Sequence, residues 1–167
     1  MPEIRTGVLP EHAALISALE ATGNYRVLQR FEARTHYAAP TPSTGVRRGL
    51  IVDVETTGLD TTNDRIIELG LVAFEFDSAG RVYGVHTMRD WFEDPGIPIP
   101  IEAVEITGIT DDMVRGQRID DAAVAAEIEA AHLVIAHNAN FDRRMLERRF
   151  PAFATKHWGC SLHDVPW

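Results

Sequence analysis

The sequence predicts an α/β fold in which helices cover a mixed sheet, and three observations indicate it. Three consecutive strand-like segments separated by short turns are typical of an antiparallel meander. After them, helical and strand-like segments alternate, which places helices against a sheet. One of the later strands, "LVIA" at 133–136, is an uninterrupted apolar run of the kind found in strands buried on both faces. The predicted order is therefore β-β-β-α-β-α-β.

Length and composition suit one main domain with its own core. The chain has 167 residues, of which 45% are hydrophobic and 25% charged. It shows no apolar run near the roughly 20 residues of a membrane helix and no secretion signal, and Cys160 is its single cysteine. We therefore expect no membrane partner and a cytoplasmic location.

The net charge of −9 argues against a protein that wraps long duplex nucleic acid through a broad basic surface. A nucleic-acid partner would have to be held locally. Divalent cations that bridge carboxylates to phosphate would achieve this, since they reverse the local charge.

Two parts are expected along the chain. Residues 1–48 form an N-terminal segment with a helix over 11–22, a second amphipathic piece over 25–34 and a linker rich in Pro, Ser, Thr and Gly. Residues 49–167 form the main domain. We find no motif in the N-terminal segment that indicates a role.

The main domain opens with three strands and then becomes irregular. Strands are predicted at 50–56, 64–76 and 81–92, with the turn "DSAG" between the last two. Residues 93–114 are broken by Pro and Gly, and Thr110 is a candidate N-cap there. The elements expected after this region are a helix at 120–131, the strand at 133–136, a helix at 138–150 and a strand at 158–162.

Two acids interrupt the first strand of the main domain. Asp53 and Glu55 are two positions apart, so their side chains project from the same face. Two ionised carboxylates in one small volume need compensation, either from arginines at an exposed strand end or from divalent cations. The following Thr56-Thr57-Gly58 favours the second alternative, because a sharp turn with Gly lets backbone N–H groups and hydroxyls approach a phosphate or a terminal sugar.

A third acid, Asp142, lies in the helix predicted at 138–150, with Asn138 or Asn140 as its expected N-cap. Asp142 lies four residues before Leu146 on the apolar face, so it leans toward the sheet. The alternative is a first-turn acid that the helix dipole alone stabilises. Arginines crowd the same helix, and each is either a phosphate contact or a solvated charge paired along the helix.

The segments "VDVETTGLD", "DRIIELG", "ITGITDDMV" and "AHNANFD" together resemble the DEDD family of 3′-to-5′ exonucleases. The resemblance covers roughly residues 49–165 and extends to DnaQ-like proteins such as the proofreading epsilon subunit of bacterial DNA polymerase III. It implies an RNase H-like fold with a central mixed sheet flanked by helices.

The resemblance also implies a two-metal site. Asp53, Glu55 and Asp142 would hold two Mg²⁺ or Mn²⁺ ions, which would activate water and stabilise the leaving 3′ oxygen. The terminal nucleotide would be contacted by the turn after the first strand and by Asn138. His137 beside it would either touch substrate or serve as a hydrogen-bonded structural imidazole. The expected substrate-binding residues are Thr56, Thr57, Gly58, Leu59, His137 and Asn138.

Two departures from the family pattern stand out. Thr107 occupies a position where many relatives carry His, and the third motif, a His followed five residues later by Asp, does not occur before Trp167. Neither His157 nor His163 has an Asp five positions on. We therefore expect a domain truncated at its C-terminus.

Two functions from different classes follow. The first is a metal-dependent 3′–5′ exonuclease that acts on single-stranded or frayed DNA, or on RNA, and that works either alone or with DNA polymerase III subunits. The second is a catalytically inert module that binds nucleic acid or a polymerase, because the motif expected to supply the general base is missing.

Overall fold

The computed structural model describes residues 10–28, 35–39 and 45–166. The chain divides into two compact units, Met1–Ala33 and Arg34–Trp167. The described part of the first unit consists of helix α1 (Pro10–Ala21) and the irregular residues after it. This confirms the first predicted helix. The second helical piece predicted at 25–34 is wrong over 25–28, which are not helical, and its remainder lies outside the described residues.

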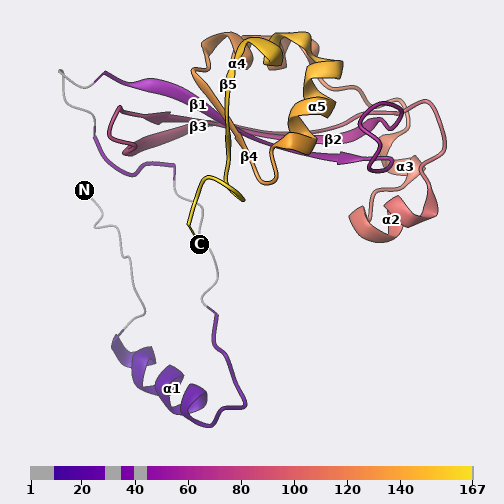
Figure 1. Ribbon diagram of the computed structural model, residues 1–167. Coiled ribbons are helices and arrows are strands. Elements are labelled where there is room, and N and C mark those ends of the chain that lie inside the picture. Colours follow the sequence, from indigo (N-terminus) through magenta and orange to yellow (C-terminus); the bar gives the residue numbers. More distant parts are fainter. Residues whose placement is uncertain (1–9, 29–34, 40–44, 167) are drawn as a thin grey trace. The chain divides into compact units, whose positions relative to one another are not determined.

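The second unit is built on a five-stranded sheet with the spatial order β3-β2-β1-β4-β5 (Figure 1). The strands β1, β2 and β3 form the predicted antiparallel meander, and β4 pairs in parallel with both β1 and β5. The sheet is therefore mixed, as the sequence predicts. The strands are β1 (Arg47–Thr56), β2 (Ile66–Phe76), β3 (Val82–Phe92), β4 (Leu133–Ala136) and β5 (His157–Cys160).

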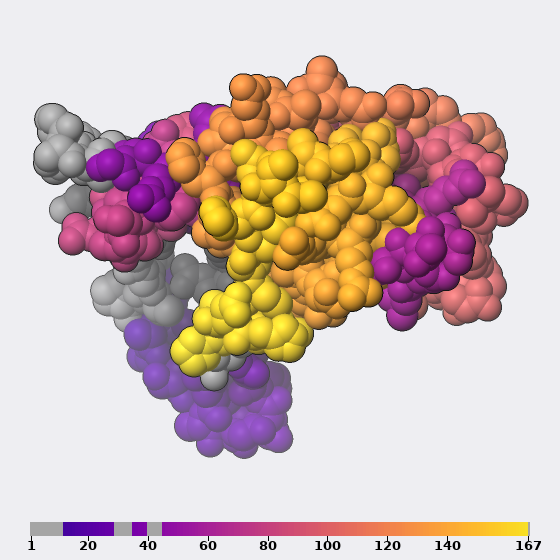
Figure 2. All heavy atoms as spheres, turned by 45° about the horizontal axis from the view of Figure 1, so that its top comes forward, coloured from indigo at the N-terminus to yellow at the C-terminus, as the bar shows by residue number. Residues whose placement is uncertain are grey.

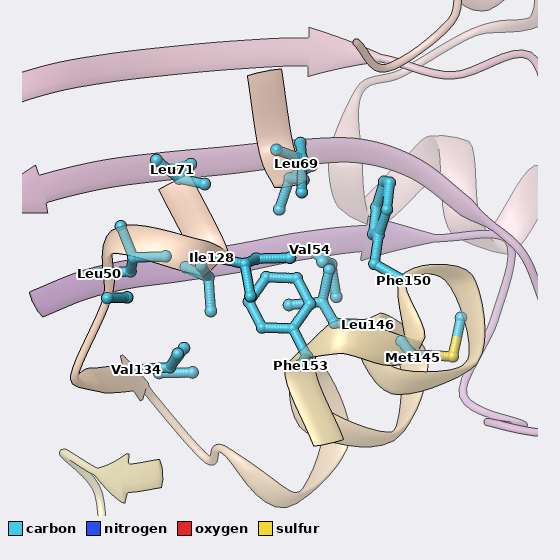
Figure 3. Packing of buried hydrophobic residues seen from close by; sticks show 14 of the residues in the cluster. Leu50, Val54, Leu69, Leu71, Ile128, Val134, Met145, Leu146, Phe150 and Phe153 are labelled. Atoms are coloured by element: carbon cyan, nitrogen blue, oxygen red, sulfur yellow. The ribbon is translucent and has the colours of Figure 1, made fainter. Parts of the chain in front are cut away.

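Helices α4 (Asp121–Ala130) and α5 (Asn140–Arg149) cover one face of the sheet (Figure 1). Even-numbered residues of β1, such as Leu50 and Val54, are buried against them because strand side chains alternate between faces. Figure 3 shows this core, to which a short 3₁₀ helix, Pro151–Thr155, contributes the fully buried Phe153.

The two covering helices begin differently. Asp120 caps α4, and its carboxylate accepts a hydrogen bond from the Ala123 N–H at 2.9 Å. In contrast, the expectation that Asn138 or Asn140 caps α5 is wrong. The N-cap residue is Ala139, no side chain makes a capping bond, and Asn138 instead takes a left-handed backbone conformation with φ 61°. Asparagine tolerates that conformation better than most residues do, so it suits the tight turn between β4 and α5.

The irregular region after β3 packs around a second, smaller cluster that also includes Ile67 of β2. It contains the short helices α2 (Ile101–Thr107) and α3 (Asp111–Val114), and Ile99 and Ile109 belong to the same buried cluster. Thr110 is the N-cap residue of α3, as predicted, but its side chain makes no capping hydrogen bond.

Part of the predicted linker belongs to the sheet. The Val85 N–H donates to the Thr35 carbonyl at 2.8 Å, and the Tyr37 N–H donates to the Tyr83 carbonyl at 2.9 Å. His36 thus forms a bridge to β3 opposite Gly84, which the Pro- and Thr-rich composition did not indicate. None of the helices that the structure describes is long and apolar enough to cross a membrane.

Candidate active site

The candidate site lies where β1 continues past its parallel neighbour. β4 pairs with β1 only from Gly49 to Ile51, so the later part of β1 has no β4 partner. After β4, the chain turns into α5, whose first turn carries Asp142. The Asp142 carboxylate accepts a hydrogen bond from the Val54 N–H at 3.2 Å, and this contact joins two segments 88 residues apart. The third predicted acid therefore meets the strand that carries the other two.

Asp53 and Glu55 project together from the face of β1 opposite the helices. Val52 and Val54 are buried under α4 and α5, whereas Ile51 on the other face is 46% exposed. Burial raises the pKa of Glu55, and the negative charge of Asp53 raises it further. The two carboxylates thus interact with each other, as the spacing predicts.

The pKa of Asp142 is strongly raised. Its side chain is buried, with 3% of the residue exposed. Burial raises its pKa to about 6, the charges of Asp53 and Glu55 add to the increase, and hydrogen bonds from backbone N–H groups oppose it. Asp142 is therefore not a solvated first-turn acid stabilised by the helix dipole alone.

Two further acids share this face, and local sequence patterns did not indicate them. Glu68 lies directly opposite Glu55 in the antiparallel ladder, and Asp90 follows Asp53 across Gly70. Burial raises the pKa of Glu68, and the charges of Asp90, Glu55 and Asp53 add to it. Correct pairing of "DRIIELG" with the first strand would have revealed Glu68, because opposite residues share a face. Asp90 required the register of β3, which two irregularities shift.

The turn after β1 is held together by its own polar groups. The Thr57 hydroxyl donates to Asp64 Oδ1 at 2.9 Å and accepts from the Arg65 N–H, while the Thr56 hydroxyl donates to the Gly58 carbonyl at 2.6 Å. Both threonines are buried. A substrate contact by these two hydroxyls stays a prediction, and so does a substrate contact by Gly58.

Three other predicted substrate contacts are accessible. Leu59 is 86% exposed at the tip of the turn. His137 and Asn138 are exposed after β4, and His137 Nδ1 lies 3.1 Å from the Ser161 hydroxyl. His137 is thus hydrogen-bonded and accessible at once, so both alternatives for this residue stay open.

The arginines of α5 do not neutralise the acids of the site. Arg143 pairs with Glu147, Arg149 pairs with Glu93 and Asp121, and Arg148 donates to backbone carbonyls. Within the part of the chain that the structure describes, neither the Asp53 nor the Glu55 carboxylate forms an ion pair or accepts a hydrogen bond. The alternative in which arginines compensate these two acids is therefore not observed among those residues.

The donor set suits a hard divalent cation. Asp53, Glu55 and Asp142 offer carboxylate oxygens, the ligands that Mg²⁺ and Mn²⁺ prefer, and burial and then the neighbouring negative charges raise the pKa values of Glu55 and Asp142. Among the described residues, however, no three His, Cys, Asp or Glu side chains lie close enough together to form a ligand group as they stand. The metal site stays a prediction.

Comparison with solved structures supports the fold. Escherichia coli exonuclease I in complex with a dA16 oligonucleotide aligns with a TM-score of 0.51 at 23% identity, covering 69% of this chain and 28% of that protein. An inhibitor-bound exonuclease I structure aligns with a TM-score of 0.53 at 24% identity, covering 70% of this chain and 28% of that protein. At these identities the likeness shows a shared fold, which is the RNase H-like arrangement expected from the sequence.

Sequence comparison finds relatives in much larger proteins. The chain is 36% identical over 95 residues to a PolC-type DNA polymerase III of Clostridium perfringens, covering 56% of this chain and 6% of the polymerase. It is also 36% identical over 104 residues to the Halalkalibacterium halodurans protein of the same name, covering 60% and 7%. The model of the RNase T exonuclease family matches residues 50–165, which include the whole sheet except the start of β1. The chain therefore belongs to this exonuclease family.

Proposed function

We propose that the second unit is a metal-dependent 3′–5′ exonuclease that releases nucleoside monophosphates from the 3′ ends of single-stranded or frayed DNA. The observation that carries the proposal is the hydrogen bond from the Val54 N–H to Asp142, which brings a buried acid to the strand of Asp53 and Glu55. Family membership supports the class of reaction.

Asp53, Glu55 and Asp142 would hold the cations. When bound, divalent ions would supply water activation and charge neutralisation at the phosphodiester. The chain's own contribution is positioning: the Val54 N–H orients Asp142, and burial of this residue between α5 and β1 shields its carboxylate from water. The exposed Leu59, in the turn after β1, and the exposed Asn138, between β4 and α5, would contact the terminal nucleotide.

DNA is the preferred substrate because the relatives are named DNA polymerases and exonuclease I was solved with an oligonucleotide. Proofreading beside a DNA polymerase III subunit is the corresponding cellular role. RNA is the alternative substrate, because no described residue is identified as a reader of the 2′-hydroxyl.

The test is degradation of a 3′-labelled single strand with Mg²⁺ or Mn²⁺. We expect release of labelled mononucleotide, abolished by EDTA. Glu55→Gln and Asp53→Asn should each lower the rate by at least about 100-fold, because each removes a cation ligand. Glu129→Gln, a matched change at an exposed position of α4, should not alter the rate.

Equal label loss in the wild type, Glu55→Gln and Asp53→Asn would indicate a contaminating nuclease and refute the site. A folded wild type with no activity that still binds the strand would favour the inert binding module. An RNA strand of the same sequence, run in parallel, decides between the two substrates.

A further inference from the structure

A second candidate site lies beside the turn that follows β1. A cavity of about 460 Å³ opens between this turn, the end of β3 and the second half of α5. Figure 2 shows the purple turn bordering the orange surface of α5. The volume falls within the roughly 300–1,000 Å³ of small-molecule sites. None of Asp53, Glu55 and Asp142 lines this cavity, so it is not part of the carboxylate site.

The cavity is locally cationic in a protein of net charge −9. Its lining contains three arginines, Arg65, Arg148 and Arg149, against two acids, Glu93 and Asp94, which gives a formal charge of +1. A positive concavity on an acidic protein concentrates anions at that place.

Both acids of the lining are already engaged. Glu93 accepts three hydrogen bonds of 2.9–3.2 Å from Arg149, which also pairs with Asp121 outside the lining, so the charge of Arg149 is compensated. The Asp94 carboxylate accepts the N–H groups of Gly96 and Gly116, each at 2.8 Å, and these bonds lower its pKa. Neither acid forms an ion pair with the two remaining arginines.

Arg65 and Arg148 are held by neutral partners. Arg65 donates to the Pro95 carbonyl, and Arg148 donates to the carbonyls of Thr61 and Asp64. Neither forms an ion pair with a carboxylate among the described residues. Their guanidinium groups are therefore fixed in place by the backbone while their charge remains uncompensated there.

The surroundings leave room for a ligand beside these groups. Thr62 and Asn63 add polar groups to the rim, and Ile66 and Met145 give an apolar wall.

We propose that this cavity binds a phosphate group of a nucleotide through Arg65 and Arg148. Arginine suits this role because its planar group of N–H donors matches phosphate oxygens. The apolar wall would accept the sugar or base. The phosphate comes either from a free nucleoside monophosphate or from a phosphodiester of a DNA strand.

The test is calorimetric titration of the intact protein with dTMP in EDTA. Without divalent ions the carboxylate site repels phosphate, so binding reports on the cavity whether or not the proposed nuclease function holds. We expect Arg65→Gln and Arg148→Gln each to weaken dTMP binding by about tenfold, because each removes a charged donor. Arg81→Gln, at an exposed position in the turn between β2 and β3, should leave it unchanged.

Thymidine, which lacks the phosphate, should not bind. An oligothymidylate without terminal phosphates identifies the source: competition with dTMP indicates strand phosphodiesters, and its absence indicates free nucleotide. Melting curves establish that the variants fold, and Arg65→Lys keeps the charge while removing the planar donors. The proposal is overturned if the wild type does not bind dTMP, or if folded Arg65→Gln and Arg148→Gln bind it as tightly as Arg81→Gln.

Discussion

Asp142 combines burial, a backbone hydrogen bond and two acidic neighbours in one side chain. An acid whose pKa is raised in the folded state binds its proton more tightly there than in the unfolded chain. Its ionisation therefore lowers the free energy of unfolding as pH rises from about 4, near the unfolded value, to about 6, the folded value. Above this pH range the full reduction in the free energy of unfolding remains.

Asp142→Asn should relieve that penalty. The amide oxygen can still accept the Val54 N–H, but it carries no charge to bury. We expect the variant to be more stable than the wild type at pH 7 in EDTA, by at most about 3 kcal/mol, with the difference disappearing below pH 4. Urea unfolding at both pH values measures this. A stability difference that does not depend on pH would show that the charge of Asp142 is not the cause.

Gly58 is required by the turn that carries Leu59. A Cβ at this position would lie 2.5 Å from Asp64 Oδ2, and Asp64 is held by the Thr57 hydroxyl and the Asp60 N–H. We expect Gly58→Ala to displace this carboxylate and to lower the free energy of unfolding by about 1–3 kcal/mol. Urea unfolding checks the value. Gly45→Ala, where a Cβ meets nothing within 4 Å, is the matched control and should be neutral.

At the scale of elements, the site arises from unequal strand lengths. β1 has ten residues but pairs with β4 over only three. The part of β1 that carries Asp53 and Glu55 therefore extends past β4. The Val54 N–H then lacks a strand partner, and the first turn of α5 supplies Asp142 instead. A carboxylate thus replaces a ladder hydrogen bond at the point where the sheet ends.

Much of this arrangement follows from local patterns. The alternation in β1 predicted the shared face of Asp53 and Glu55, and the apolar face of α5 predicted that Asp142 approaches the sheet. The prediction of an asparagine cap for α5 was wrong, because Asn138 takes a left-handed backbone conformation and its side chain makes no capping hydrogen bond. Glu68 and the pairing of Thr35 with β3 depend on register between strands, which no single segment encodes.

Arg149 ties three elements together. It donates to Glu93 after β3 and to Asp121 at the start of α4, and it lowers the pKa of Asp121 through that hydrogen bond. Arg149→Met keeps the apolar stem but leaves the half-buried Glu93 without its cation. We expect a loss of about 1–3 kcal/mol in the free energy of unfolding, measured in urea at pH 7.

The control for this prediction is Arg115→Met, which removes an exposed pair with Asp112 and should change stability by no more than about 0.5 kcal/mol. Equal effects of the two substitutions would show that Arg149 acts as an ordinary surface charge.

At the scale of the whole molecule, charge is distributed unevenly. Asp53, Glu55, Glu68 and Asp90 gather on one face of the sheet, and the arginines of α5 lie with the helix on the other side. An anionic strand approaching the acidic face is repelled unless cations intervene. The same charges that make the domain acidic therefore make its proposed activity depend on divalent ions.

This dependence can be measured without any substrate. Ions that bind only the folded state raise its stability, by about 2.7 kcal/mol at one hundred times the dissociation constant, which corresponds to roughly 5–10 °C in melting temperature. We expect Mn²⁺ to raise the melting temperature of the wild type by this order. Asp53→Asn should largely abolish the increase, because it removes a carboxylate from the shared cluster, whereas Glu129→Gln should keep it. If Mn²⁺ shifts all three proteins equally, or if NaCl of the same ionic strength reproduces the shift, the effect is general screening of the net charge and the carboxylate cluster is not a cation site.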